Sequence, residues 1–261
     1  MGEIEVIELF LSLALSDVVE TCPTAVQQYV ENEASQPIAS AEQVFISSLI
    51  DEIENLHFDG DVPDNAWDYF QWRRQSADNE TIACLLGLVA QEQYLRLWFR
   101  LAQTPGHAES ATQEQLRAAS GILGQIDERN RIWLSERIEQ SGWFTISEHG
   151  EDADLAAFLI VQHADQDVQF QRNMLNQLEP LAESGDTDSG RYAMLIDRVA
   201  VNSGELQVYG SQGYCSGPME WQARPYEGTQ EELDQRRQNV GLPDHQVYVD
   251  RISRNCSARE Y

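Results

Sequence analysis

Seven consecutive apolar residues, Leu155–Val161, lead directly into the polar sequence Gln162–Asp165. A helix that is apolar on every face is normally buried, so we expect the polar residues that continue it inside the protein or at the floor of a cleft. We predict one long helix, from about Glu151 to Leu178, that contains both segments. Each buried polar group without a partner costs about 1–3 kcal/mol, so this helix requires polar partners from the rest of the chain.

Most of the chain carries helical signals. Capping-box spacing occurs at residues 40–43, 112–115 and 229–232, where Ser or Thr is followed three residues later by Gln or Glu. The alternating residues Leu206–Tyr209 and Met219–Ala223 predict one hairpin around a glycine-rich turn. The fold class that we expect is mainly α, a multi-helical domain with one small β-hairpin. The predicted helices are Ile4–Val19, Thr24–Asn32, Ser40–Asn55, Asp64–Trp72, Asn79–Leu101, Thr112–Gln140, Glu151–Leu178, Arg191–Asn202, Thr229–Arg237 and Val247–Arg251.

Charge divides the chain into two parts. No basic residue precedes Arg73, so we predict an acidic helical N-terminal arm over residues 1–75 and a helical domain over residues 76–261. The apolar segment Ile4–Val19 is too short to span a bilayer, and its flanks are acidic where an anchor or signal peptide carries Lys or Arg. A cytoplasmic protein is therefore expected, with a periplasmic or secreted protein that has lost its signal peptide as the alternative.

The composition excludes several classes of partner and reaction. The formal net charge is -27, which disfavours binding to nucleic acid and to anionic membranes. All 17 basic residues are arginine, so sites that need a lysine amine are excluded, including Walker-type phosphate loops and Schiff bases. We expect no cofactor.

The cysteines and acidic loops give little support for a metal site. Cys22, Cys84, Cys215 and Cys256 form no Cys-x-x-Cys pair, so a structural zinc site is not expected. Free thiols are favoured, and Cys215 could pair with Cys256 only in an oxidising compartment. The acidic residues of Phe58–Asp64 miss the spacing of a calcium loop. One histidine, His163, with Asp127 or Asp165 is a poor set of ligands for a transition metal.

Polar residues recur inside or beside otherwise apolar elements. Burying that many requires a connected hydrogen-bond network, which either fixes one packing arrangement or holds a ligand. The candidate catalytic residues are His163, Asp165 and Asp197, and the candidate substrate-binding residues are Asn130, Gln162, Arg198, Tyr209, Gln212 and Arg237.

Two classes of function fit this pattern. In the first, the chain is a binding or interaction module: the polar cluster fixes the fold, and the acidic arm or the hairpin with Trp221 meets a basic protein partner. In the alternative, the chain is a small-molecule hydrolase or lyase. His163 is then a general acid or base oriented by Asp165 or Asp197, and Arg198 and Arg237 hold a small anionic substrate.

Residues from about Leu85 to Arg251 resemble an uncharacterised bacterial family, the domain of unknown function 6624. The resemblance implies the domain and its key residues but no activity. Ser211 stands where the family usually has Thr, and Glu92 stands where we expect Asp. The matching segments are Asp127–Asn130, Gly142–Trp143, Gln162–Asp165, Asp197–Val199, Gln207–Gln212, Arg236–Arg237 and Val240–Pro243.

Overall fold

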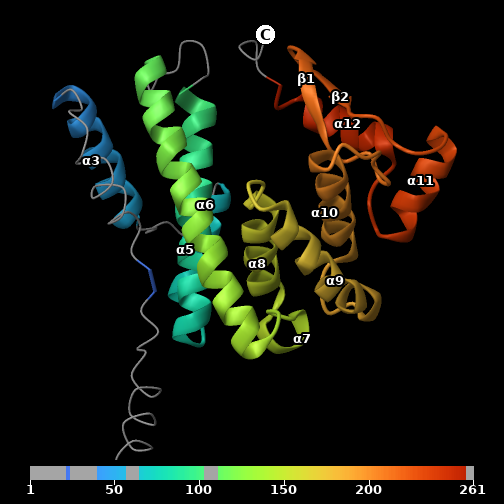
Figure 1. The fold of residues 1–261 in the computed structure, drawn as a ribbon, viewed down its shortest axis with the longest axis horizontal. Coiled ribbons are helices and arrows are strands. Elements are labelled where there is room, and N and C mark those ends of the chain that lie inside the picture. Colours follow the sequence, from blue (N-terminus) through green and yellow to red (C-terminus); the bar gives the residue numbers. More distant parts are fainter. Residues whose placement is uncertain (1–21, 24–39, 57–64, 103–110, 257–261) are drawn as a thin grey trace, which may run out of the picture.

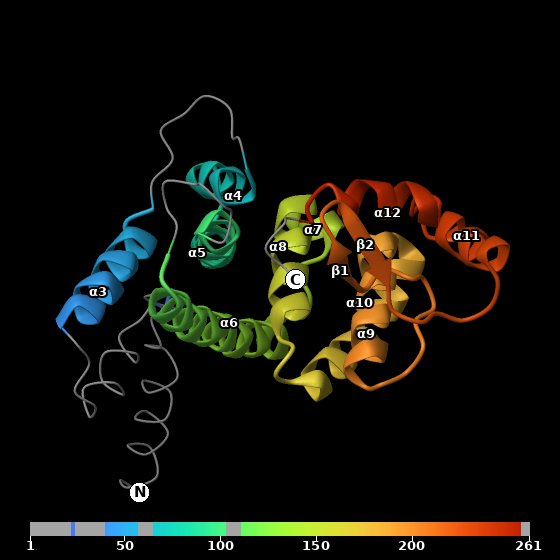
Figure 2. The ribbon, with the colours of Figure 1, turned by 90° about the horizontal axis from the view of Figure 1, so that it is seen from above.

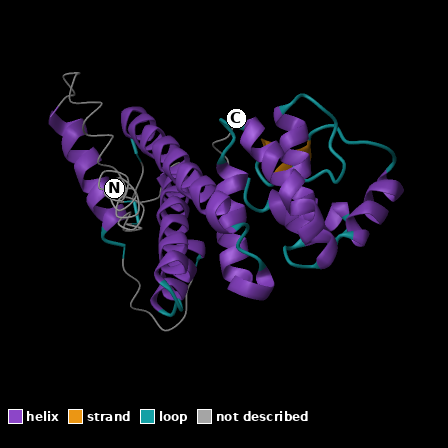
Figure 3. Cartoon of the chain, turned by 60° about the horizontal axis from the view of Figure 1, so that its bottom comes forward, coloured by secondary structure: helices purple, strands orange, loops and turns teal. Residues whose placement is uncertain are grey.

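The computed structural model describes residues 22–23, 40–56, 65–102 and 111–256. Within these residues the chain is helical apart from one small hairpin, as the sequence predicts (Figures 1 and 3). The predicted helices Ile4–Val19 and Thr24–Asn32 and the acidic loop Phe58–Asp64 lie outside the described residues. The helices are α3 (Ser40–Glu54), α4 (Ala66–Gln75), α5 (Glu80–Ala102), α6 (Gln113–Ser141), α7 (Ile146–His149), α8 (Glu151–His163), α9 (Val168–Ser184), α10 (Ser189–Asn202), α11 (Gln230–Asn239) and α12 (His245–Ser253).

Local capping signals place the helix starts correctly. The capping boxes of α6, from Thr112 to Gln115, and of α11, from Thr229 to Glu232, are both formed in full. Each box satisfies free backbone N–H groups in the first turn of its helix. The starts of these helices therefore follow from the local sequence.

The prediction of one helix from Glu151 to Leu178 is wrong, because α8 ends at His163 and α9 begins at Val168. Two local bonds stabilise the break. The N–H of Ala164 donates to the carbonyl of Val161, and the side chain of Asp167 accepts from the N–H of Phe170. Asp167 is thus an N-cap, a role that ends the preceding helix and starts the next one. As a consequence His163 lies at the C-terminal end of α8 instead of in the middle of a helix.

The predicted hairpin is formed and its second strand is confirmed, but its first strand lies further along the chain than predicted. Its strands are β1 (Gly213–Gly217) and β2 (Glu220–Ala223), paired antiparallel, with Met219 in the turn at a positive φ of 62°. Gln207, in the segment predicted as the first strand, makes only an isolated parallel bridge with Tyr226. The N–H groups of Val208 and Tyr209 bond to a side chain of α10, so they cannot donate to a neighbouring strand.

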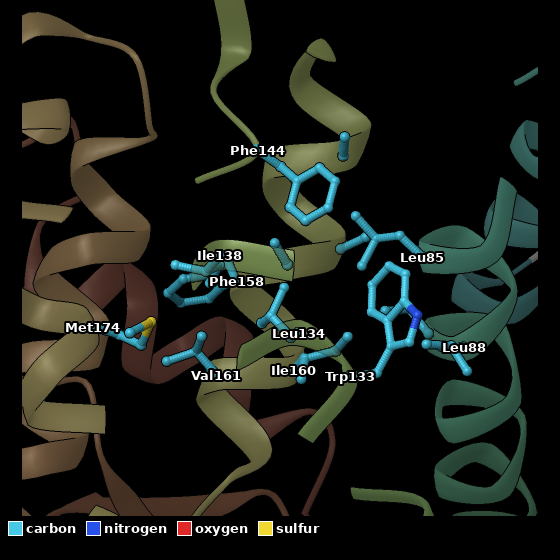
Figure 4. Close-up of a cluster of buried hydrophobic side chains, with 14 of the residues drawn as sticks. Leu85, Leu88, Trp133, Leu134, Ile138, Phe144, Phe158, Ile160, Val161 and Met174 are labelled. Carbon is cyan, nitrogen blue, oxygen red and sulfur yellow. The ribbon is translucent and has the colours of Figure 1, made fainter. Parts of the chain in front are cut away.

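Two apolar cores organise the helices. The larger one joins α4, α5, α6, α8, α9 and α10, and Figure 4 shows Trp133 of α6 beside Leu85 and Leu88 of α5. A smaller core joins α3 to α5 and α6 through Ile53, Leu95 and Ile122. In Figures 1 and 2, α3 lies at one end of the molecule and α11, α12 and the hairpin lie toward the other, with α5, α6 and α8 side by side between them. The apolar face of α8 therefore packs in the middle of the fold.

The N-terminal end of α8 is fixed by a buried carboxylate. Asp154 is 0 % exposed and lies in the first turn of the helix. Its Oδ1 accepts from Trp143 Nε1 at 2.8 Å and from Thr187 Oγ1 at 2.6 Å, and its Oδ2 pairs with Arg191 Nη2 at 2.6 Å. Both oxygens therefore have partners, and these bonds tie α8 to α10 and to the turn after α6.

The expectation of free thiols is wrong, because all four cysteines are paired. Cys22 is bonded to Cys84 of α5, and Cys215 of β1 is bonded to Cys256 after α12. The first bond attaches the segment before α3 to the main core, and the second holds the hairpin against the C-terminal helix. Cysteine spacing alone did not reveal these pairs, because pairing depends on the distances between the folded elements.

The predicted domain boundary near residue 76 stays a prediction, although Phe70 of the predicted arm packs in the larger core. None of the described helices combines the length and the apolar character needed to cross a membrane.

A second buried carboxylate shapes the loop 207–212, which we call the Asp197 loop. Asp197 of α10 is 0 % exposed. Its Oδ1 accepts the N–H groups of Val208 and Tyr209, both at 2.8 Å, and its Oδ2 accepts that of Ser211 at 2.7 Å. Three backbone donors on one side chain hold this loop in an irregular conformation.

The side chains around the Asp197 loop reinforce it. Arg237 of α11 is 0 % exposed and donates to the carbonyls of Tyr209 and Pro243 at 2.6 and 2.7 Å. The hydroxyl of Tyr248 donates to the carbonyl of Ser211 at 2.8 Å, and His245 Nε2 lies 3.1 Å from the carbonyl of Gly210. Burial lowers the pKa of His245, and the nearby Arg237 lowers it further. The loop is thus held from α10, α11 and α12 together.

We predict that Asp197→Ala lowers the free energy of unfolding by about 3 kcal/mol or more, because it leaves three inward N–H groups without their acceptor. Asp165→Ala is the matched control. Asp165 is 45 % exposed in its pair with Arg198, so its loss is expected to cost about 1 kcal/mol or less. Denaturation of both variants in urea measures the difference. Equal losses would show that Asp197 does not hold the loop.

Candidate functional site

The break after α8 directs His163 toward α5 and α6. Its Nδ1 lies 2.8 Å from Oε1 of Glu92 on α5. The side chain of Glu92 is 0 % exposed, whereas that of His163 keeps 10 % of its surface exposed. A carboxylate with no exposed surface therefore orients a histidine ring that is in contact with solvent.

The neighbours of His163 favour one tautomer of its ring. Gln162 Nε2, an amide donor, lies 3.3 Å from His163 Nε2. If this amide donates to Nε2, the ring proton is on Nδ1 and is donated to Glu92. Glu92 Oε1 also accepts from Gln93 Nε2 at 3.0 Å. In contrast, Glu92 Oε2 is buried and has no hydrogen-bond partner among the described residues.

Two arginines and a second carboxylate surround this pair. Arg96 of α5 donates through Nη2 to both oxygens of Asp127 on α6, at 2.8 and 2.9 Å. Arg129 donates to Gln91 Oε1 at 2.9 Å and to Asn130 Oδ1 at 2.8 Å. Buried nitrogens of both arginines, Arg96 Nε and Arg129 Nη1, have no partner among the described residues. We call Glu92, Arg96, Asp127, Arg129 and His163 the His163 group.

Burial and neighbouring charges shift the pKa values of this group in different directions. Burial by itself raises the pKa of Glu92, but His163 and Arg96 lower it more, so the net shift is downward. Burial raises the pKa of Asp127 to about 6, with Arg96 opposing the shift. Burial lowers the pKa of Arg129 to about 10, although Glu92 opposes this. Strongly shifted ionisable groups that lie close together are typical of functional sites.

Three residues of the His163 group are of the types that bind metal ions, and they lie close together. One ligand atom from each of Glu92, Asp127 and His163 lies within 4.8 Å of the other two. The three residues come from three different helices, α5, α6 and α8, that pack against one another. Asn130, predicted as a core polar residue, is 0 % exposed next to them and donates to the carbonyl of Leu88.

Asp165 and Arg198 form a separate group beyond the break. Arg198 Nε and Nη2 each lie 2.8 Å from one oxygen of Asp165, and Arg198 Nη1 donates to Gln212 at 3.2 Å. Asn202 and Gln171 also donate to Asp165. Burial raises the pKa of Asp165, but the bonds and charge of Arg198 lower it more. This bidentate pair connects the start of α9, α10 and the Asp197 loop.

The predicted site residues are therefore distributed over three groups. His163, Gln162 and Asn130 belong to the neighbourhood of Glu92. Asp165, Arg198 and Gln212 form the second group. Tyr209 lies in the Asp197 loop, and Asp197 and Arg237 hold that loop from α10 and α11. The partner of His163 is Glu92 instead of Asp165 or Asp197, and the nearby guanidinium groups are Arg96 and Arg129 instead of Arg198 and Arg237.

Sequence reasoning did not identify Glu92 as the partner of His163, although a signal was present. Leu85, Leu88, Glu92 and Leu95 follow one another at helical spacing in α5, and all four are nearly or fully buried. An acid on an apolar stripe requires a polar partner from another element. Which element supplies that partner is decided by helix packing.

Comparisons with known proteins give one result. No curated protein and no solved structure matches the chain. The model of a family of unknown function, DUF6624, matches residues 105–257, which run from before α6 to the end of α12 and include Asp127, Arg129 and His163. The match covers more than half of the chain and agrees with the resemblance noted from its motifs, so the chain belongs to the family of unknown function DUF6624.

Proposed function

We propose that this chain binds a small anionic molecule at the His163 group and acts on it as a hydrolase or lyase. The observation that carries the proposal is the pairing of a solvent-accessible histidine with a fully buried carboxylate, Glu92. Burying a carboxylate is costly unless it has partners, and the partner of Glu92 is a ring in contact with solvent, so this pair favours a functional role. The enzyme hypothesis calls for a histidine oriented by a carboxylate, and Glu92 takes the role expected of Asp165 or Asp197.

The surrounding charges support an anionic substrate. Arg96 and Arg129 each have a buried nitrogen without a partner among the described residues. A guanidinium group with a free donor binds carboxylate or phosphate oxygens through charge-assisted hydrogen bonds. Arg237 also has a buried nitrogen, Nη2, without a partner among the described residues, but it bonds the carbonyls of Tyr209 and Pro243 at the Asp197 loop and not at the His163 group. Arg198 is bonded to Asp165 and Gln212. We therefore assign the binding of the anionic group to Arg129, with Arg96 beside it.

We expect a small carboxylate or phosphate compound to raise the melting temperature of the wild-type protein. At 100 times the Kd, binding adds about 2.7 kcal/mol to the free energy of unfolding, which corresponds to a shift of about 5–10 °C for a chain of this size. His163→Asn and Arg129→Gln are expected to remove most of the shift. A thermal-shift screen of anionic metabolites measures it.

His149→Ala is the matched control, because this histidine packs against Phe144 away from the group. It is expected to keep the ligand shift of the wild type. A ligand that stabilises His163→Asn as strongly as wild type, or a screen in which no anion stabilises the wild type, contradicts the proposed function.

A separate pocket favours the interaction module as a second candidate function. It has a volume of about 490 Å³ and lies between α3, α4 and α5. Asp51 and Glu52 supply carboxylates, and Trp67 and Tyr94 form an edge-to-face pair with ring centroids 5.5 Å apart. Carboxylates beside aromatic faces suit a cationic side chain of a basic partner.

For this second candidate, we expect an arginine-rich peptide to bind the full chain and to quench tryptophan fluorescence. The double variant Asp51→Asn with Glu52→Gln is expected to weaken binding at least fivefold at 0.15 M salt. The double variant Asp250→Asn with Glu231→Gln removes two exposed carboxylates outside the pocket and serves as the control. Equal loss in both proteins would mean that the peptide only senses the overall acidic charge.

The disulfides support the periplasmic or secreted alternative for the location of the protein. Two disulfides account for all four cysteines, and stable disulfides are rare in reducing cytosol. We propose an oxidising compartment on this basis.

The location is checked by alkylating rapidly quenched cells of the source organism with a mass-shifting maleimide. An unreduced chain is expected to take up no label, and a chain reduced beforehand four labels. Uptake of four labels without reduction would place the protein in a reducing compartment.

A further inference from the structure

Three carboxylates are fully buried in the described part of the chain, and they differ in one respect. Both oxygens of Asp154 accept hydrogen bonds, and so do both oxygens of Asp197. Glu92 is equally buried, but its Oε2 has no partner among the described residues. A buried carboxylate oxygen without a partner is costly, so its presence requires a specific explanation.

The neighbours of Glu92 suggest which group could bind its unpaired oxygen. Asp127 and His163 each place a ligand atom within 4.8 Å of it and of each other. Ligand atoms at about 2.0–2.2 Å from one ion lie at most about 4.4 Å apart. To coordinate one ion together, the ligand atoms of the three side chains would therefore have to move by roughly 0.5–1.5 Å. Side-chain rotation supplies movements of this size.

We propose that Glu92, Asp127 and His163 bind one first-row divalent metal ion, Mn²⁺ or Zn²⁺. A single imidazole with two carboxylates is a mixed nitrogen and oxygen ligand set. Imidazole favours Zn²⁺ and its neighbours in the row, and carboxylates favour Mn²⁺. Glu92 Oε2 becomes a ligand and thereby gains the partner that it lacks. The remaining coordination positions are open to water or substrate.

Neighbouring side chains are suited to orient these ligands. Arg96 donates through one nitrogen to both oxygens of Asp127, and each carboxylate oxygen has two lone pairs, so Arg96 and a metal ion can share Asp127. Gln93 donates to Glu92, and Gln162 lies against His163 Nε2. The amide of Gln162 offers an acceptor as well as donors, so it supports the ring when Nδ1 binds the metal and the proton moves to Nε2. Such outer contacts fix the orientation of metal ligands.

The charges connect the metal site to the proposed function, on which this inference rests for its substrate. Two carboxylates balance a divalent ion, and Arg96 and Arg129 then leave the group positively charged overall. That excess attracts an anionic substrate. A bound metal lowers the pKa of a coordinated water to about 7 and so supplies the nucleophile that a hydrolase needs. The metal therefore replaces His163 in the activation of water, and His163 serves as a ligand.

The test is a metal titration of the full chain, which needs no substrate. Chelator-treated protein is titrated with Mn²⁺, with free Mn²⁺ followed by electron paramagnetic resonance, and with Zn²⁺ by calorimetry, both at 0.15 M salt. One saturable site per chain is expected. Glu92→Gln, Asp127→Asn and His163→Ala are each expected to raise the Kd at least tenfold.

Controls separate this site from the acidic surface, since the chain has a net charge of -27. Asp165→Asn and Asp51→Asn each remove a carboxylate elsewhere and are expected to leave the Kd within twofold of wild type. Circular dichroism shows whether each variant is folded; if Glu92→Gln is not, Asp127→Asn and His163→Ala decide the result, because neither residue is fully buried. The inference is overturned if no saturable site exists, or if the Kd is unchanged in the folded variants.

Different experimental results would contradict the metal site and the proposed function. If the metal titration fails while an anion still stabilises the wild type through His163, the function stands and the ring itself handles the proton. If the metal binds while no anion shifts the melting temperature, the metal site stands alone.

Discussion

A charge inside a protein has to be paired, and this constraint accounts for much of the structure. Asp154, Asp197 and Glu92 are all fully buried. Asp154 joins α8 to α10, and Asp197 holds the loop that follows α10. In each of these two carboxylates, both oxygens accept hydrogen bonds from groups in other elements. Each carboxylate therefore acts as a structural tie between those elements. Removing the donors would leave a charge in the core, which is why these contacts fix the positions of the elements they join.

Glu92 follows the same constraint with a different result. Its Oε1 is paired with His163 and Gln93, but its second oxygen is buried without a partner among the described residues. A carboxylate used only to hold helices together would resemble Asp154. The incomplete bonding at Glu92, beside a solvent-accessible histidine and two arginines, is the reason why we propose a ligand site there. Helix α8 connects the two kinds of group, because Asp154 lies in its first turn and His163 is its last residue.

Much of the helical structure could be predicted from local sequence. The starts of α6 and α11 follow from complete capping boxes, whose bonds involve residues only three apart. The burial of Asn130 follows from its position on an apolar stripe. The break at Ala164 was missed because polar residues continued an apolar helix without glycine or proline, and the N-cap of Asp167 decided the outcome. The first strand of the hairpin was misplaced because the N–H groups of Val208 and Tyr209 bond to Asp197, a residue in another element.

The sequence by itself determined that the chain is mainly helical, that it is strongly acidic, that lysine chemistry is excluded and that His163 belongs to an apolar helix that must be buried. These properties depend on composition and on contacts between near neighbours. Only the tertiary structure decided which carboxylate pairs with His163, because Glu92 is 71 residues away along the chain and is brought to it by the packing of α5 against α8. The same holds for the pairing of the cysteines and for the meeting of Asp127 with Glu92 and His163. Such contacts are set by how helices pack, and no local pattern specifies them.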